Sequence, residues 1–134
     1  MNLIKYKIKG DSRGSLIALE ANKDIPFEIK RIYYIFDTKE GVVRGRHAHK
    51  ALEQILICVS GSCTIVIDDG KERTEVVLNK PDIGLYIGPN MWREMKDFSP
   101  GAVLLVLASD FYNEADYIRN YDEFLKYVSS AAVK

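Results

Sequence analysis

Short apolar runs separated by turn-forming residues recur along most of this chain, and they limit the folds that it can adopt. LIKYKIKG (3–10) and RTEVVLN (73–79) alternate apolar with polar residues, whereas GAVLLVLASD (101–110) is apolar almost throughout. Turn residues stand between the runs, as in Asp69-Gly70, a strong hairpin signal. Many short strands at regular spacing predict an antiparallel β-sandwich or barrel, with residues 101–110 as a strand buried on both faces.

Further predicted strands fill most of the remaining chain up to residue 110. They are SLIALEA (15–21), IKRIYYIFD (29–37), LEQILICVSG (52–61), CTIVIDDG (63–70) and DIGLYIGPN (82–90). The tail NEADYIRNYDEFLKYV (113–128) follows a different pattern, with apolar residues at helical spacing. The apolar stripe consists of Tyr117, Tyr121, Phe124, Leu125 and Val128. We therefore expect one amphipathic helix packed on the β fold, while a helix that binds a partner is the alternative.

Length and charge narrow the classes of function. A chain of 134 residues is expected to form one domain, spanning residues 1–134. The chain has 19 basic and 19 acidic residues, so a zero net charge gives no reason to expect a nucleic-acid partner or a membrane surface. No signal-peptide pattern and no run long enough for a membrane span occurs, so we expect a cytoplasmic protein.

The two histidines of the chain lie one residue apart, in RGRHAHK (44–50). On a strand, His47 and His49 would point to the same face, with Cβ atoms about 6–7 Å apart. Such a pair suits two ligands of one metal ion, or two acid–base groups beside one substrate. Two surface histidines on an edge strand are the third possibility.

The residues after the histidines resemble the motifs of the cupin family. Glu53 and Gly61 follow His49 in the order of the first cupin motif, with one extra residue before the glycine, and GLYIGPNMWREM matches the second motif at Pro89. The histidine that usually ends the second motif is absent, and Arg93 stands nearest to its place. Arginine does not ligate metals and repels cations. We therefore expect no metal, although Glu53 and both histidines could still form a facial triad.

Metal-free histidines among arginines suit acid–base chemistry on a phosphate-bearing substrate. Arginine binds phosphate through a planar fork, and a neutral histidine accepts a proton at cellular pH. More specifically, the chain resembles the dTDP-4-keto-6-deoxy-D-glucose 3,4-ketoisomerases, a group of WxcM-like cupins. The resemblance spans nearly the whole chain, in the order RGRHAHK, LEQ, GLYIGP, Trp92 and SDFYNEADYIRNYD.

This resemblance implies a fold, a reaction and an assembly. The fold is a jelly roll, and the assembly is a homodimer in which N-terminal strands cross to the neighbouring subunit. The reaction moves a keto group from C4 to C3 of a dTDP-linked 4-keto-6-deoxyhexose without a cofactor, in the biosynthesis of 3-amino sugars for antibiotics or surface glycans. A proton leaves C3, an enediol forms and a proton is delivered to C4.

The resemblance also implies roles for individual residues. His47 is the principal base and His49 the second acid–base group. Arg44 contacts the diphosphate or the enediolate, on condition that Gly45 forms a bulge, because strict alternation turns residue 44 away from His47. Arg13, in DSRG, resembles an arginine that reaches the diphosphate of a neighbouring subunit in the related 3,5-epimerases. By alternation Arg46 points away from His47 into solvent.

Four further residues are candidates for substrate contact. Tyr33 offers a phenol to the sugar or stacks on thymine, and its face is expected to line the cavity rather than that of Tyr34, because Arg31 shares it. Glu53 could orient a histidine or lie on the surface. Trp92 could pack over the substrate or belong to the core. Arg93 is expected near the sugar, where it would affect which face of the enediol is protonated at C4.

Three alternatives to the ketoisomerase interpretation remain open. The first is a 3,5-epimerase acting on the same substrate. The others are a metal-dependent cupin and a non-catalytic protein that binds nucleotide sugars. The pair of histidines in H-x-H favours the ketoisomerase.

Overall fold

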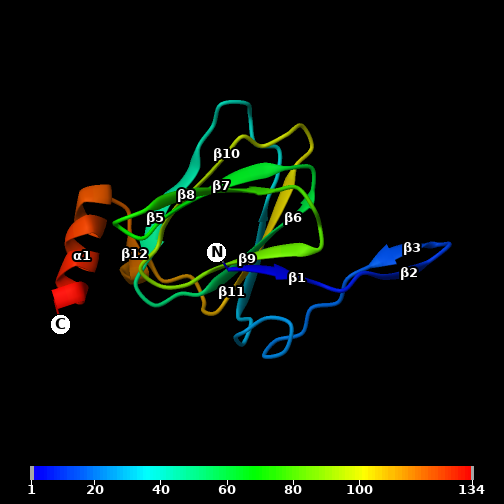
Figure 1. The fold of residues 1–134 in the computed structure, drawn as a ribbon, viewed down its shortest axis with the longest axis horizontal. Coiled ribbons are helices and arrows are strands. Elements are labelled where there is room, and N and C mark those ends of the chain that lie inside the picture. The colour runs from blue at the N-terminus through cyan, green and yellow to red at the C-terminus, as the bar shows by residue number, and fades with distance from the viewer. Residues whose placement is uncertain (1, 134) are drawn as a thin grey trace.

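Two five-stranded antiparallel sheets pack face to face, and one helix lies against the outside of the second sheet (Figure 1). The structure, a computed structural model, describes residues 2–133. The first sheet has the strand order β1 (Leu3–Lys5), β9 (Ile83–Ile87), β6 (Gln54–Ser60), β11 (Val103–Ala108) and β4 (Arg31–Ile35). The second has the order β12 (Tyr117–Ile118), β5 (Arg44–His49), β10 (Trp92–Lys96), β7 (Cys63–Asp68) and β8 (Arg73–Leu78). The predicted antiparallel β fold with a C-terminal helix is confirmed.

The main core fills the space between the two sheets. Alternate residues of each strand point inward, as the two-residue period of a strand requires. Leu56, Leu104 and Leu85 of the first sheet are buried against Ile65 and Met95 of the second. On β11, Leu104 and Val106 face this core, whereas Leu105 and Leu107 pack into the cluster on the outside of the sheet, so both faces of the strand are apolar.

Both outer faces of the sandwich are also partly covered. The N-terminal segment places Tyr6, Ile25 and Phe27 against Ile55 and Ile57 on the outside of the first sheet. On the second sheet, the helix α1 (Tyr121–Val133) covers a smaller cluster. This cluster consists of Ala48, Trp92, Ile118 and Phe124.

The N-terminal third contains less strand than its pattern predicts. Residues 3–10 form β1 and then enter β2 (Lys9–Asp11), which pairs with β3 (Gly14–Leu16) in a hairpin that extends away from the sandwich (Figure 1). The predicted strand over 15–21 was wrong beyond Leu16. The hairpin is exposed along its length, and after it Ile17 and Leu19 pack against the apolar cluster on the outside of the first sheet instead of continuing the strand.

The predicted helix over 113–128 was wrong in its first half. Residues Glu114–Asp116 form one turn of 3-10 helix, and Tyr117–Ile118 form the short strand β12, which pairs with β5. α1 begins only at Tyr121. Tyr117 is therefore not part of the helical stripe but faces the two histidines, because pairing with β5 fixes it opposite His49.

Within residues 2–133, the structure contains no helix that is both long enough and apolar enough to cross a membrane.

Candidate active site

A bulge in β5 brings Arg44 and His47 to one face of the strand. Gly45 and Arg46 both have positive φ, at 83° and 56°, and the pairing of β5 with β10 shifts by one residue at this point. The extra residue cancels the alternation that would turn Arg44 away from His47. The structure therefore contains the bulge at Gly45 on which the predicted role of Arg44 depends. Arg46 is exposed, as its position in the alternation predicts.

Both histidines face the inside of the sandwich. Ala48, between them, packs outward under α1. The imidazole rings of His47 and His49 contact each other edge to face, with centroids 4.9 Å apart. Among the described residues, neither ring nitrogen of His47 has a hydrogen-bond partner, and Nε2 of His49 has none. Within residues 2–133, these three nitrogens are thus buried without a protein partner.

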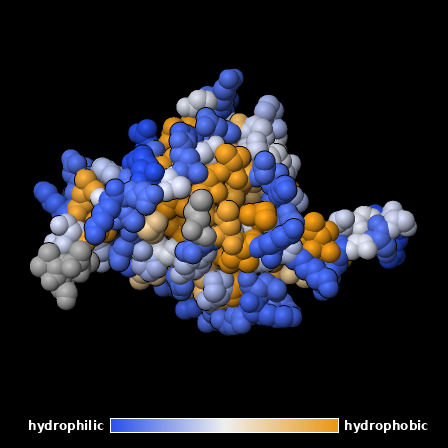
Figure 2. Space-filling view, viewed as in Figure 1, coloured by the Kyte–Doolittle hydropathy of each residue, from blue (hydrophilic) through white to orange (hydrophobic). Residues whose placement is uncertain are grey.

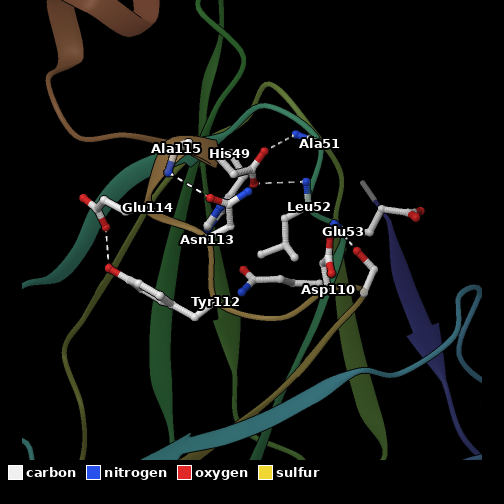
Figure 3. Close-up of polar contacts among 12 residues, drawn as sticks. His49, Ala51, Leu52, Glu53, Asp110, Tyr112, Asn113, Glu114 and Ala115 are labelled. Carbon is white, nitrogen blue, oxygen red and sulfur yellow. Dashed lines mark hydrogen bonds and ion pairs between the residues drawn. The ribbon is translucent and has the colours of Figure 1, made fainter.

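Asp116 holds His49 in one tautomer. Its carboxylate lies 3.0 Å from Nδ1 of His49 and also accepts hydrogen bonds from the backbone nitrogens of Ala51 and Leu52, at 2.8 and 3.3 Å. Figure 3 shows these two backbone contacts beside His49. A carboxylate accepts only, so Nδ1 carries the proton and Nε2 carries the lone pair.

Arg93 is a buried cation opposite the histidines. Its side chain is fully buried, and residue 93 pairs with His47 across β5 and β10. The guanidinium donates to Oε1 of Gln54 at 2.6 Å and to the carbonyl of Met91 at 3.0 and 3.2 Å. Both partners are uncharged. Burial lowers the pKa of Arg93 to about 10, so the side chain keeps its charge at neutral pH.

This environment keeps both histidines neutral. Burial, followed by the charge of Arg93, lowers the pKa of His47 to about 4 and that of His49 to about 2. Desolvation and a nearby cation both disfavour the imidazolium, which explains the direction of these shifts. At neutral pH both rings are therefore in the neutral form, which has one nitrogen with a lone pair.

Two hollows adjoin the histidines, and Tyr117 lines both. The larger, of about 300 Å³, is lined by Arg31, Tyr33, Ile35, Arg44, Gly45, His47, Met95 and Tyr117. The smaller, of about 140 Å³, contains His49, Asp116 and the loop over 109–113. The ring centroid of Tyr117 lies 5.0 Å from that of His47 and 4.3 Å from that of His49. Arg31 borders both hollows, so it is a further cation available to a ligand.

The structure distinguishes Tyr33 from Tyr34. Tyr33 points inward, and its hydroxyl accepts a hydrogen bond from Nε2 of Gln54 at 3.1 Å. Tyr34 points to the other face and is 62% exposed. The guanidinium of Arg31 lies over the rings of Tyr33 and Tyr112, at 5.5 and 5.7 Å.

Three candidate residues make their contacts away from the two histidines. Arg13 lies at the tip of the β2–β3 hairpin, where it pairs with Asp11 and is 88% exposed. The carboxylate of Glu53 accepts from the Tyr86 hydroxyl at 2.6 Å, so Asp116 rather than Glu53 orients a histidine. Trp92 is buried against α1 and donates to Glu94 at 2.9 Å, on the face of β10 opposite to Arg93.

The sequence interpretation missed several residues at this site. Asp116 and Tyr117 stand in the matched tail SDFYNEADYIRNYD, but the helical spacing of that tail concealed them. Gln54 stands in the matched LEQ. Within residues 2–133, no group of three or more His, Cys, Asp and Glu side chains is arranged to hold a metal ion.

Comparison with known proteins places the chain in a family. The model of the family described as FdtA: WxcM-like, C-terminal, matches residues 1–129. The chain belongs to this family. This WxcM-like chain is 58% identical over 127 residues to the TDP-4-oxo-6-deoxy-alpha-D-glucose-3,4-oxoisomerase of Aneurinibacillus thermoaerophilus, with 95% of this chain and 91% of the relative covered.

Solved structures agree with this assignment. The WlaRB TDP-quinovose 3,4-ketoisomerase from Campylobacter jejuni is 66% identical to the WxcM-like chain, with a TM-score of 0.90, covering 93% of this chain and 96% of that one. A mutant of the 3,4-ketoisomerase QdtA from Thermoanaerobacterium thermosaccharolyticum, in complex with TDP-4-keto-6-deoxyglucose, is 49% identical. Its TM-score is 0.93, covering 96% of this chain and 93% of that one.

A more distant neighbour shows how the fold extends beyond the family. The rmlC epimerase of Mycobacterium tuberculosis is 21% identical to the WxcM-like chain, with a TM-score of 0.72, covering 86% of this chain and 66% of that one. At this identity the likeness concerns the fold alone.

Proposed function

We propose that this protein is an isomerase that converts TDP-4-keto-6-deoxy-glucose into the TDP-3-keto-6-deoxyhexose. The observation that carries the proposal is the pair of neutral, inward-facing histidines beside the buried cation of Arg93. The names of the relatives, which are 3,4-ketoisomerases or the equivalent 3,4-oxoisomerase, support this choice of sugar and reaction.

The reaction is an internal shift of protons and electrons. A base removes the proton from C3, the electrons of that C–H bond form a C3=C4 double bond, and the C4 carbonyl oxygen takes up a proton. The resulting enediol loses the proton of its C3 hydroxyl while C4 gains a proton. The product has a hydroxyl at C4 and a carbonyl at C3, so no external oxidant or reductant is needed.

His47 is the base at C3 in this proposal. It borders the larger hollow together with Tyr33 and Arg44, and its ring nitrogens are free of partners among the described residues. Its lowered pKa keeps it neutral and able to accept a proton. His49 is the second acid–base group, because Asp116 keeps the proton on Nδ1 and thereby leaves Nε2 with the lone pair.

The arginines divide between the two ends of the substrate. Arg44 and Arg31 border the larger hollow, which supports a role for both in binding the diphosphate. Arg93 lies beneath the histidines, where its charge stabilises the enediolate and affects the face on which C4 is protonated. A permanent cation at this depth also repels a divalent metal ion, which supports a metal-free mechanism. Turnover that stops on chelation and returns with a metal would contradict that mechanism.

The assembly that we propose is a homodimer with exchanged N-terminal strands. The β2–β3 hairpin extends away from the sandwich and holds Arg13 apart from the histidines of its own chain, which supports a role for this arginine at the site of a neighbouring subunit (Figure 1). Apolar surface lies at the base of the hairpin (Figure 2), where Ile8, Leu16 and Val59 are exposed beside a groove of about 420 Å³. Sedimentation should give a dimer, and Arg13→Ala should weaken TDP binding; a monomer with full affinity would contradict this assembly.

Replacement of His47 separates catalysis from binding. His47→Asn should abolish conversion of TDP-4-keto-6-deoxyglucose, because the amide cannot act as a base, yet it should leave the affinity for TDP within about threefold of wild type. Tyr34→Phe, on the exposed face of β4, is the control and should retain full activity. Turnover by His47→Asn, or no turnover by the wild type, would contradict the proposed function.

A further inference from the structure

Gln54 is a polar side chain at the start of the central strand of the first sheet. It is the first residue of β6, pairs with Ala108 and Ile87 on the two neighbouring strands, and is fully buried. A buried primary amide destabilises a fold unless its donors and acceptor are bonded. The chain retains Gln54 next to the fully buried Ile55 and Leu56, so its hydrogen bonds need an explanation.

Both ends of the Gln54 amide bind residues of the candidate active site. Its Oε1 accepts from Nη1 of Arg93 at 2.6 Å, and its Nε2 donates to the Tyr33 hydroxyl at 3.1 Å. Arginine has no acceptor, so the amide oxygen must face Arg93. The amide nitrogen, which only donates, then faces Tyr33. The orientation of the amide is therefore fixed by its partners.

This orientation determines what the Tyr33 hydroxyl can do. Since its oxygen accepts from Gln54, the phenol hydrogen is not used by that contact. Tyr33 lines the larger hollow together with His47 and Arg44. The phenol is thereby left as a hydrogen-bond donor towards this hollow, on the same side as the base.

We propose that Gln54 is a positioning residue, which holds Tyr33 as a donor to the substrate oxygen that becomes negatively charged and holds Arg93 beside the same oxygen. This inference rests on the proposed function. Donors fixed in place before the reaction stabilise a developing oxyanion without reorganisation, and the loss of one such donor typically lowers kcat by about 10²–10³-fold. Gln54 itself does not touch the substrate.

The substitution Gln54→Glu tests this role with little change in shape. A carboxylate accepts only, so it would take the phenol hydrogen of Tyr33 and turn that donor away from the hollow. It would also neutralise the charge of Arg93. We expect kcat to fall by roughly 100-fold, while KM and the affinity for TDP stay within about threefold of wild type. A merely structural role would instead lower the melting temperature and affect binding and turnover together.

A double-mutant cycle with Tyr33→Phe gives the sharpest test. If Gln54 acts through the Tyr33 hydroxyl, the loss of kcat caused by Gln54→Glu should be smaller in the Tyr33→Phe background than in the wild type, and the loss that remains is the part due to Arg93. The matched control is Tyr34→Phe, which makes the same change on the exposed face of β4. In this background Gln54→Glu should lower kcat as much as it does in the wild type. Additive losses in the Tyr33→Phe cycle, or wild-type kcat in Gln54→Glu, would overturn the inference.

Two further measurements keep the test decisive. If Gln54→Glu does not fold, Gln54→Met removes both hydrogen bonds at similar volume, and the same cycle with Tyr33→Phe applies. Titration of tyrosine absorbance, compared with Tyr33→Phe, detects the contact without turnover, because a carboxylate raises the pKa of an adjacent phenol. If the tyrosine titration of Gln54→Glu equals that of the wild type, the contact between residue 54 and the Tyr33 hydroxyl is overturned. An inactive wild type overturns the proposed function, whereas an active wild type with additive losses overturns this inference alone.

Discussion

Asp116 lies 3.0 Å from Nδ1 of His49, although 67 residues separate the two along the chain. The short strand β12 makes this contact possible, because it pairs with β5 immediately after Asp116. Two backbone hydrogen bonds, from Ala51 and Leu52, fix the carboxylate in turn. The orientation of His49, the proposed second acid–base group, thus depends on a loop that precedes the C-terminal helix.

Asp116→Asn should impair catalysis more than binding. An amide can present its nitrogen to Nδ1, which favours the wrong tautomer of His49, and loss of an orienting carboxylate costs about 10- to 100-fold in activity. Steady-state kinetics should show this loss in kcat with little change in KM. The control is Glu53→Gln, which alters a carboxylate bonded to Tyr86 and should stay near wild type. Equal losses in the two variants would contradict the assignment.

The activity should be nearly independent of pH from about 8 to about 5 and fall at lower pH. The base must be neutral, and the pKa of His47 is lowered to about 4, so protonation removes the base only as the pH approaches that value. The free energy of unfolding should decrease as the pH falls below about 6.5. Histidines of the unfolded chain bind protons in this range, whereas the folded histidines, with their lowered pKa values, remain neutral. A pH–rate profile with a midpoint near 6.5 would contradict the shifted pKa.

Arg93→Met should raise the pKa of both histidines. The charge of Arg93 contributes to lowering each pKa, and methionine fills a similar buried space without charge. Because the chain has only two histidines, their imidazole signals can be followed by NMR over a pH titration without ambiguity. We expect upward shifts of both pKa values and a kcat lower by at least about tenfold. Unchanged titrations would show that Arg93 does not act on the pair.

In the β5 bulge, Gly45→Ala should be destabilising, whereas Arg46→Gly should be tolerated. Gly45 has φ of 83°, and a Cβ at this position would lie 3.2 Å from the carbonyl oxygen of Arg93, so Gly45→Ala should destabilise the fold by about 1–3 kcal/mol. It should also reduce kcat by displacing Arg44 from His47. Arg46→Gly is the matched control, because residue 46 also has positive φ and glycine adopts it freely. Thermal unfolding and kinetics of the two variants give the comparison.

The sequence predicted the β framework well because its strands follow a simple physical pattern. Apolar runs such as 63–70 and 101–110 become strands wherever a second sheet is available to bury one face. The N-terminal run over 15–21 has the same pattern, but its strand ends at Leu16, and Ile17 and Leu19 pack on the outer face of the first sheet without joining a strand. Local composition does not contain the information on where the sheet ends.

The site was predicted in part for a similar reason. The same-face relation of His47 and His49 follows from the period of a strand, and the bulge at Gly45 was anticipated only as a condition. Tyr117 was assigned to a helical stripe, since its spacing from Tyr121 fits a helix as well as a strand followed by a helix. The contact between Asp116 and His49 joins distant segments, and no local pattern encodes it.

Conversion of TDP-4-keto-6-deoxyglucose in D2O, followed by proton NMR, tests the central claim most directly. A 3,4-ketoisomerase that works through an enediol should place deuterium from the solvent at C4 of the 3-keto product. His47→Asn should form no product under the same conditions. Deuterium at C5, as a 3,5-epimerase would introduce, or continued turnover by His47→Asn would contradict the account.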